Sequence, residues 1–488
     1  MFFLGNTIYM FDLARVFSVK IPKRGTVSPE AVRAEFSLCD DLTERRAAAG
    51  AGPAEAAVLW LDGLTDARAV SEEILSPLYA LRCRSEEELR RRALRGGICR
   101  CAVRERLNVR ETAGDIAAGC AAVILPALGT ALTFEVKTSQ VRSVEAPTVE
   151  KSVLGPKEAF VETLRTNTAL VRRRLPSPAL KCREFTPDAA APGKAALLYM
   201  EGIAPADRVE TAAARLAGAS LPFPGDPGAL ERQLAGRPGG AFPRTLHTER
   251  PDSFARGLLE GKVGILTDGL PVGFLLPGTL PEMLRTREDD ARHAAVARAL
   301  TLLRWAALVL SLTLPAVYVA AAMYHQEMIP QKLLLSVIRA KEEVPFSTAA
   351  EVLGMLFSFE LLQEAGVRLP DPAGQTVSII GALIVGQSAV EAKVLSPIVI
   401  IVVAMAGIGG YAQPSQELGA AVRLWRFGLV LCAAVLGLFG LAAGLLALLW
   451  RLCGTETLGV CFLYPLCDAP ARKARQAVLR SPSGEEEA

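Results

Sequence analysis

The chain has 488 residues, of which 51% are hydrophobic, and a mean hydropathy of +0.30. Lys and Arg number 54 against 51 Asp and Glu, and this near balance gives no support to nucleic-acid binding. The charges are unevenly distributed, with 78 charged residues in 1–302 and only 17 in 303–450. A soluble composition therefore precedes a membrane composition, which excludes a fully soluble enzyme and a transporter that is embedded in the membrane throughout.

The first 302 residues contain an internal repeat. The run 58–63 (VLWLDG) resembles 197–202 (LLYMEG) at an offset of 139, and 121–134 resembles 263–276 at an offset of 142. Each copy is typical of short strands with amphipathic helices, and Asp268-Gly269 favours a hairpin turn because glycine tolerates positive φ. We therefore predict an α+β N-terminal region of two duplicated α/β subdomains, at 40–150 and 178–290, after a leader over 1–39.

A helix is predicted between the two copies, in a linker over 151–177. Pro156 suits its first turn, where no amide donor is needed, and Phe160 and Leu164 begin an apolar face. A docking helix for a partner or the membrane surface is one interpretation, with Phe160, Leu164, Arg165 and Asn167 as its candidate residues. A solvated helix whose basic end complements its own dipole is the alternative. Further on, the glycine- and proline-rich stretch 225–244 is predicted to be a loop.

Four runs without charges or nearly so lie in the membrane domain predicted over 291–452. They fall at about 305–324, 376–393, 394–412 and 427–450, and spanning a hydrocarbon core requires about 20 helical residues. A fifth candidate at 346–365 contains three glutamates, which are costly at bilayer depth unless they face protein or water. We expect an α-helical multi-pass domain with four or five transmembrane helices, followed by a C-terminal tail over 453–488.

The basic residues around these runs leave the topology open. Five arginines between 285 and 304 precede the first run, and the positive-inside rule then predicts that the N-terminal region faces the cytoplasm. With four spans the tail also returns to the cytoplasm, but Arg423 and Arg426 then lie outside. With five spans these two arginines lie inside and the tail lies outside.

Polar residues interrupt the membrane runs. Gln387 and Glu391 are four residues apart and share a helix face, with Ser388 beside them, so these three are candidate pore or polar membrane residues. The alternative is that Glu391 marks the water interface of a tight hairpin. The candidate vestibule or subunit-contact residues are Glu360, Glu364, Glu417, Arg423 and Arg426.

No catalytic, cofactor or metal motif is found in the sequence. The ten cysteines include no CxxC pair, Cys99 and Cys101 being the closest approach, so free thiols are favoured over disulfides or zinc. Three histidines form no HExxH pattern, and no P-loop, GxGxxG or GxSxG motif occurs. We therefore expect neither a cofactor nor a metal, and no enzyme.

An ordered set of short motifs resembles the GerA family of spore-germination proteins, of the A-subunit type of germinant receptor. In the N-terminal region these are 155–167 (GPKEAFVETLRTN), 201–204 (EGIA), 248–252 (TERPD) and 260–263 (EGKV), with Asp268-Gly269. In the membrane part they are 328–330 (MIP), 359–366 (FELLQEAG), 386–392 (GQSAVEA), 396–397 (SP), 417–418 (EL) and 423–427 (RLWRF). They cover about 50–450, and the stretch 412–416 (AQPSQ) departs from the family pattern.

The resemblance implies a function that composition does not. It implies a multi-pass protein of the spore inner membrane, with its N-terminal domain facing the spore core, that works with a transporter-like B-type subunit and a C-type lipoprotein subunit. It also implies a homo-oligomer in contact with membrane lipid that forms a nutrient-gated ion channel and triggers germination. The alternatives are a SpoVA-associated paralogue and a non-conducting scaffold that clusters receptors.

Overall fold

The computed structural model describes residues 27–48, 55–99, 101–138, 156–186, 193–218, 226–235, 240–368 and 386–467, with isolated positions at 147, 150, 470, 474 and 478. The chain divides into two compact units. Unit 1 comprises Met1–Arg142 and Thr168–Arg183, and unit 2 comprises Ser143–Asn167 and Glu184–Ala488. The boundary differs from the predicted subdomain limits, because the chain returns to unit 1 after its first segment in unit 2.

Unit 1 is built around a five-stranded sheet. Its strands are β1 (Leu42–Ala48), β2 (Glu55–Leu61), β3 (Val103–Arg106), β4 (Cys120–Leu125) and β5 (Thr130–Glu135), in the order β1-β2-β4-β5-β3 with antiparallel neighbours. Its helices are α2 (Pro29–Glu35), α3 (Ala67–Ala69), the π-helix η1 (Val70–Leu75), α4 (Ser76–Ala80), α5 (Glu86–Leu94) and α6 (Val109–Ala117).

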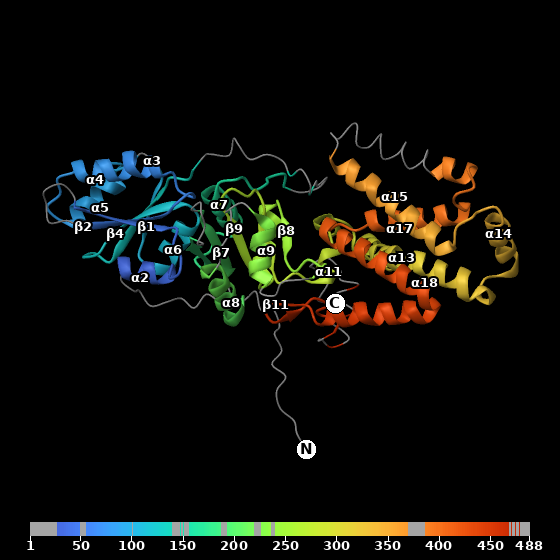
Figure 1. Ribbon diagram of the computed structural model, residues 1–488. Helices are drawn as coiled ribbons and strands as arrows, with labels where there is room; N and C mark the ends of the chain where they lie inside the picture. Colours follow the sequence, from blue (N-terminus) through green and yellow to red (C-terminus); the bar gives the residue numbers. More distant parts are fainter. Residues whose placement is uncertain are drawn as a thin grey trace, which may run out of the picture. The chain divides into compact units, whose positions relative to one another are not determined.

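Helices cover both faces of this first sheet (Figure 1). Successive strand residues point to opposite faces, so Val58 and Trp60 pack with η1, α4 and α5, whereas Leu59 and Leu61 pack with α2 and α6. This explains why β2 is buried at six successive positions. It also corrects the predicted leader over 1–39, because Val27, Val32 and Phe36 belong to this core. Of the predicted leader, residues 1–26 lie outside the described residues.

A second five-stranded sheet has the same strand order. Its strands are β6 (Leu180–Phe185), β7 (Ala195–Met200), β8 (Leu246–Thr248), β9 (Val263–Thr267) and β10 (Gly273–Leu276), in the order β6-β7-β9-β10-β8. Its helices are α7 (Leu164–Arg174), α8 (Ala206–Ala217), α9 (Pro227–Ala235) and α10 (Pro251–Leu259). The predicted hairpin at Asp268-Gly269 is confirmed, since β9 and β10 pair antiparallel around Gly269, whose φ is +82°.

The registers of the two sheets correspond at the offsets seen in the sequence. The pairs Val58↔Val123 and Val123↔Leu132 of the first sheet become Leu197↔Ile265 and Ile265↔Phe274 in the second. The helices α6 and α10 begin and end at positions that also differ by 142. The paired strands of the first sheet and the helix α6 therefore have counterparts in the second sheet and α10.

Two local predictions are wrong. The helix expected near Pro156 begins only at Leu164, because the backbone N–H of Phe160 donates to the carbonyl oxygen of Glu249 and not to a helical partner. The loop expected over 225–244 contains α9, whose first amides at Gly228 and Ala229 donate to Asp226. The buried Leu230 and Leu234 hold this helix to the core despite the glycine-rich flanks.

The C-terminal part of unit 2 is helical. After the short helices α11 (Leu280–Met283) and α12 (Arg287–Asp290) come α13 (Ala294–Tyr324), η2 (Gln326–Met328), α14 (Gln331–Lys341), α15 (Thr348–Arg368), α17 (Pro397–Tyr411) and α18 (Gln416–Cys453), then the hairpin β11 (Glu456–Thr457) and β12 (Val460–Cys461). Helices α13, α15, α17 and α18 pack into one bundle with α14 at its edge (Figure 1). The runs at 305–324, 346–365 and 394–412 are thus largely helical.

The run expected as one span over 427–450 folds back on itself. Gly437 has φ +60° and ψ −140°, a conformation that favours glycine and breaks α18 into two halves. A Cβ at Gly440 would lie 2.0 Å from the carbonyl oxygen of Cys432, and Leu418 shares a core with Leu452. α18 is therefore a tight helical hairpin, which a count of apolar residues does not reveal.

Among the described residues, α13 and the segment labelled α18 have the length and apolar composition of a membrane-crossing helix, but the break at Gly437 divides α18 into two shorter halves. α17 is apolar but has only 15 residues. Most of the predicted span 376–393 lies outside the described residues, which resume at 386 in a helical segment. The number of spans stays a prediction.

Candidate functional site

Three of the five vestibule candidates lie together inside the helical bundle. Arg423 of α18 contacts Glu360 of α15, with its Nε 3.2 Å from Oε2 of the carboxylate. One turn further along α18, Arg426 is 1% exposed and donates from Nη2 to the hydroxyl of Ser311 in α13 at 2.6 Å. Arg423 also donates to Gln363 at 2.9 Å. These groups from α13, α15 and α18 form what we call the bundle cluster.

The bundle cluster has more polar groups than partners. Nε of Arg426 and Oε1 of Glu360 are buried without a hydrogen-bond partner among the described residues. At the end of α17, Gly410 lies against the guanidinium of Arg426, and both amide atoms of the buried Gln413 likewise have no partner in that part of the chain. Such groups are costly in an apolar interior, so this region differs from a core selected for stability alone.

The placement of Arg423 and Arg426 bears on the predicted topology but leaves it a prediction. Both residues lie within α18, which begins at Gln416, and Arg426 is buried. Arg423 lies within two turns of the start of α18, a position that the positive-inside rule still counts, so the side on which this pair lies stays a prediction.

A second buried carboxylate lies in α15. Glu351 is 1% exposed, and its Oε2 accepts the backbone N–H of Ser396, the N-cap of α17, at 2.8 Å. Its Oε1 lies 3.5 Å from Nζ of Lys341 at the end of α14. The sequence indicates this glutamate as a charge within an apolar run but does not identify its partners, because they come from two other helices.

Glu417 lies apart from the bundle cluster, at the first turn of α18. Its Oε1 is 2.7 Å from Nδ1 of His247 in β8, whose Nε2 is 2.8 Å from the hydroxyl of Thr245. Thr245 in turn donates to Glu231 of α9 at 3.1 Å. This polar chain connects the second sheet to the helical bundle. Sequence analysis missed His247 and Glu231, since nothing in their spacing indicates that they meet.

The remaining membrane candidates are exposed. Gln387 donates to Glu391 at 3.0 Å along one helix face, as their spacing predicts, and both are exposed together with Ser388. Glu364 is also exposed, one turn beyond Glu360 on α15. Their roles as pore or vestibule residues stay predictions.

The docking-helix candidates are mostly buried in the fold of unit 2. Phe160 is 4% exposed and packs edge-on against Phe254, and Leu164 is buried. Asn167 is fully buried, where its side chain both accepts from and donates to the backbone of Val161, at 2.8 and 2.5 Å. Arg165 pairs with Glu184 at 2.6 Å. A docking role stays a prediction, and these contacts assign the four residues an intramolecular one.

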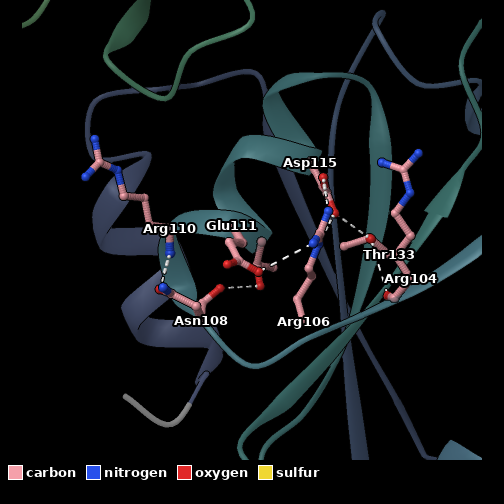
Figure 2. A network of polar contacts seen from close by, with 8 residues as sticks. Arg104, Arg106, Asn108, Arg110, Glu111, Asp115 and Thr133 are labelled. Carbon is pink, nitrogen blue, oxygen red and sulfur yellow. Dashed lines mark hydrogen bonds and ion pairs between the residues drawn. The ribbon is translucent and has the colours of Figure 1, made fainter. Parts of the chain in front are cut away.

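Unit 1 contains its own polar networks. Figure 2 shows Asp115 of α6 accepting from Arg106 at 2.7 and 3.2 Å and from Thr133 at 2.7 Å. Burial raises the pKa of Asp115, but these hydrogen bonds outweigh it and the net pKa is lowered. Elsewhere Arg172 forms a bidentate pair with Asp41 at 2.5 and 2.8 Å, both side chains being buried. The contacts of Asp115 join α6 to β3 and β5, and the pair of Arg172 and Asp41 joins α7 to the residue before β1.

A disulfide joins Cys99 and Cys101, whose Cα atoms are 5.4 Å apart. This corrects the expectation of free thiols throughout. A spacing of two residues fits no familiar motif, so no signal in the sequence indicates this disulfide. The cysteines at 39, 83, 120, 182, 432, 453, 461 and 467 form no disulfide.

Comparison with known proteins identifies the family. The profile described as "Bacillus/Clostridium GerA spore germination protein" matches residues 30–487. Spore germination protein KA of Bacillus subtilis (strain 168) is 32% identical over 426 residues, covering 87% of this chain and 78% of that protein. Spore germination protein B1 of the same strain is 31% identical over 448 residues, covering 91% and 92%.

A solved structure also matches. The crystal structure of the N-terminal domain of the A subunit of the Bacillus megaterium spore germinant receptor GerK3 aligns with 52% of this chain and 97% of its own, at 22% identity and a TM-score of 0.41. The family profile extends over both sheets and the helical bundle and agrees with the ordered motifs, so this chain belongs to the GerA family of spore germination proteins.

Proposed function

We propose that this chain is an A-type subunit of a nutrient germinant receptor in the spore inner membrane, where copies of it assemble into a ligand-gated ion channel. The chain would cross the membrane several times, with its N-terminal region facing the spore core. Its partners would be a transporter-like B-type subunit and a C-type lipoprotein subunit. Membership of the GerA family supports the germination role, and the long apolar helix α13 with the apolar halves of α18 supports the membrane location.

The bundle cluster is the observation that carries the ion-channel proposal. Glu360, Arg423 and Arg426 are ionisable groups within a bundle of apolar helices, and Arg426 is fully buried. Charges at bilayer depth are rare and mark ion pathways or gating elements. A change in the packing of α15 against α18 would alter these contacts, which offers a means to couple ligand binding to opening.

The exposed polar face of Gln387 and Glu391 supplies the candidate pore lining. Residues that line a pore between subunits are exposed in a single chain, and both side chains, with Ser388 beside them, meet this condition. The hydrogen bond between Gln387 and Glu391 keeps the two polar groups on one side of the helix.

The test is germinant-triggered cation release from spores that carry Glu391→Gln or Arg426→Gln. Loss of the carboxylate should change ion selectivity or rate, and loss of the buried guanidinium should abolish gating. Glu327→Gln, at an exposed position in the turn after α13, is the matched control and should release ions normally. Unchanged release and selectivity in both variants, at normal protein levels, would contradict the channel.

The non-conducting scaffold predicts a different result. Purified protein would then cluster receptors without conductance in planar bilayers, and both variants would behave as the native chain does.

We further propose that the two five-stranded sheets arose by duplication of one ancestral unit. Equal strand orders and similar offsets, of 139 and 142 residues, between paired strands support that origin.

A further inference from the structure

Three metal-ligating side chains meet in unit 1, on the face of the first sheet that η1, α4 and α5 cover. Glu73, Cys99 and Cys101 each have one ligand atom within 4.8 Å of the other two. We propose that these three residues, with the cysteines reduced, bind one zinc-type divalent cation. The site lies outside the helical bundle and is independent of the proposed receptor function.

The positions of the ligands are fixed by the core beneath them. Glu73 lies in η1, a π-helical segment. Such segments are rare in proteins overall, but those that occur are often at functional sites. Cys99 is 3% exposed and packs in one hydrophobic cluster with Val70 and Ile74 of the same turn. Cys101 is half-buried and Glu73 exposed, so a cation can enter the site from solvent.

Hydrogen bonding and charge both favour a bound cation. The sulfur of Cys99 accepts the backbone N–H of Cys101 at 3.2 Å, and an amide donor stabilises a thiolate, the form that ligates metals. Oε2 of Glu73 lies 3.3 Å from the same sulfur. Two thiolates and a carboxylate would place three negative charges in a half-buried site, where a divalent cation offsets their repulsion.

The ligand set selects the metal. Magnesium and calcium prefer oxygen ligands alone, and cuprous copper prefers sulfur, whereas zinc accepts Cys sulfur at about 2.3 Å together with a carboxylate oxygen at about 2.0–2.2 Å. Three protein ligands leave a fourth tetrahedral position for water. The sequence disfavours zinc only because no CxxC is present, and the carboxylate that completes the set comes from a turn 26 residues away from Cys99.

Metal binding requires the disulfide to be broken first. A dithiol reductant supplies two electrons and two protons, which converts the bond into the two thiols of Cys99 and Cys101 while the reductant becomes a cyclic disulfide. Each thiol then releases its proton to solvent as its sulfur ligates the cation. The metal-bound and disulfide forms are therefore mutually exclusive states of one pair.

The test uses the full chain in detergent, reduced with a dithiol that is then removed, and titrated with Co²⁺ and Zn²⁺. We expect one equivalent of Co²⁺ to produce a thiolate-to-cobalt charge-transfer band that one equivalent of Zn²⁺ displaces. Cys101→Ser and Cys99→Ser should abolish the band, and Glu73→Gln should weaken binding at least about tenfold. Cys83→Ser, which changes a buried thiol of the same cluster, is the matched control and should bind normally.

A second measurement covers the case in which Cys99→Ser fails to fold. Zinc should protect Cys99 and Cys101 of the native chain from alkylation, so that mass spectrometry counts two fewer alkyl groups. Absence of the band in the reduced native chain, its retention in Cys101→Ser, or no protection by zinc would each overturn the site. Germination assays play no part in these readouts, so failure here leaves the receptor proposal untouched.

Discussion

The two five-stranded sheets share one strand order and one register but differ in how they join helix to strand. In unit 1, Asp115 of α6 binds Arg106 of β3 and Thr133 of β5 (Figure 2). At the offset of 142, Asp115 corresponds to Gly257, Arg106 to Thr248 and Thr133 to Leu275. There a Cβ on Gly257 would lie 2.5 Å from Cδ1 of Leu275, so the helix packs directly on an apolar side chain.

This difference teaches that the backbone arrangement tolerates two chemistries at one place. An ion pair needs room for side chains between helix and strand, whereas a glycine lets the helix approach until leucine fills the gap. What is common to both solutions is a filled interface without an unpaired charge. The four predictions below test this comparison.

The largest effect on stability is expected when the carboxylate of unit 1 is introduced at the corresponding helix position of the second sheet. Gly257→Asp introduces a carboxylate where Leu275 already fills the space and no arginine is present at position 248. Overpacking and an unpaired buried charge together should cost about 5 kcal/mol. Hydrogen exchange of the β9 and β10 amides in the full chain should report the loss, with the β4 and β5 amides as an internal control. Unchanged protection would show that the helix can move aside.

The buried pair of Arg172 and Asp41 should rank second. Arg172→Met leaves Asp41 with its charge buried and unpaired, which should cost about 3–5 kcal/mol in the stability of unit 1. The double variant with Asp41→Leu removes both charges and should recover most of that loss. Thermal unfolding of the full chain and exchange of the β1 amides measure the difference. If the double variant were as unstable as the single one, the packing of the two side chains, and not their opposite charges, would account for the stability that the pair contributes.

Asp115→Asn should have a smaller and pH-dependent effect. Loss of charge-assisted hydrogen bonds to Arg106 and Thr133 should cost about 1.5–3 kcal/mol at pH 7. Because the pKa of Asp115 is lowered in the folded chain, its contribution is complete above the ordinary carboxyl pKa of about 4. The contribution is lost as pH falls through the lower folded value, so native and variant β3 amides should become equally protected in acid. If the native chain and the variant still differed in β3 amide protection in acid, the stabilisation would not depend on ionised Asp115.

The smallest effect is expected at the edge strands. His247 in β8 is the counterpart of Glu105 in β3, and Glu105 pairs with Arg90 of α5 at 2.7 Å. Glu417→Gln weakens the contact of His247 with α18, but Glu417 is 45% exposed, so about 0.5–1 kcal/mol is expected. Exchange at the first turn of α18 checks this value, and Glu364→Gln, at another exposed glutamate, serves as the control. An effect as large as that of Arg172→Met would mean that the contact is far less screened than its exposure implies.

Local patterns predicted the elements whose causes are local. The repeated apolar runs, the hairpin at Asp268-Gly269 and the helices near 305–324 and 346–365 follow from periodicity, turn chemistry and hydropathy. The predictions at Pro156 and over 225–244 were wrong because a partner distant in sequence, Glu249 in one case and the core around Leu230 in the other, determined the local structure.

The candidate site follows the same division. Composition alone selected Glu360, Arg423 and Arg426, because few charges remain in an apolar stretch. Ser311, the main hydrogen-bond partner of Arg426, could not be predicted, since one serine in a long apolar helix carries no signal of its own.

The sequence by itself determined the family, the order of a charge-rich part and an apolar helical part, and the repeated apolar runs, since each depends on residue types and spacing along the chain. Only the tertiary structure decided which charges meet, that α18 folds back at Gly437, and that Glu73 lies beside Cys99 and Cys101. The physical reason is that these features depend on backbone reversal and on contacts across tens to more than a hundred residues, and no local pattern encodes such contacts.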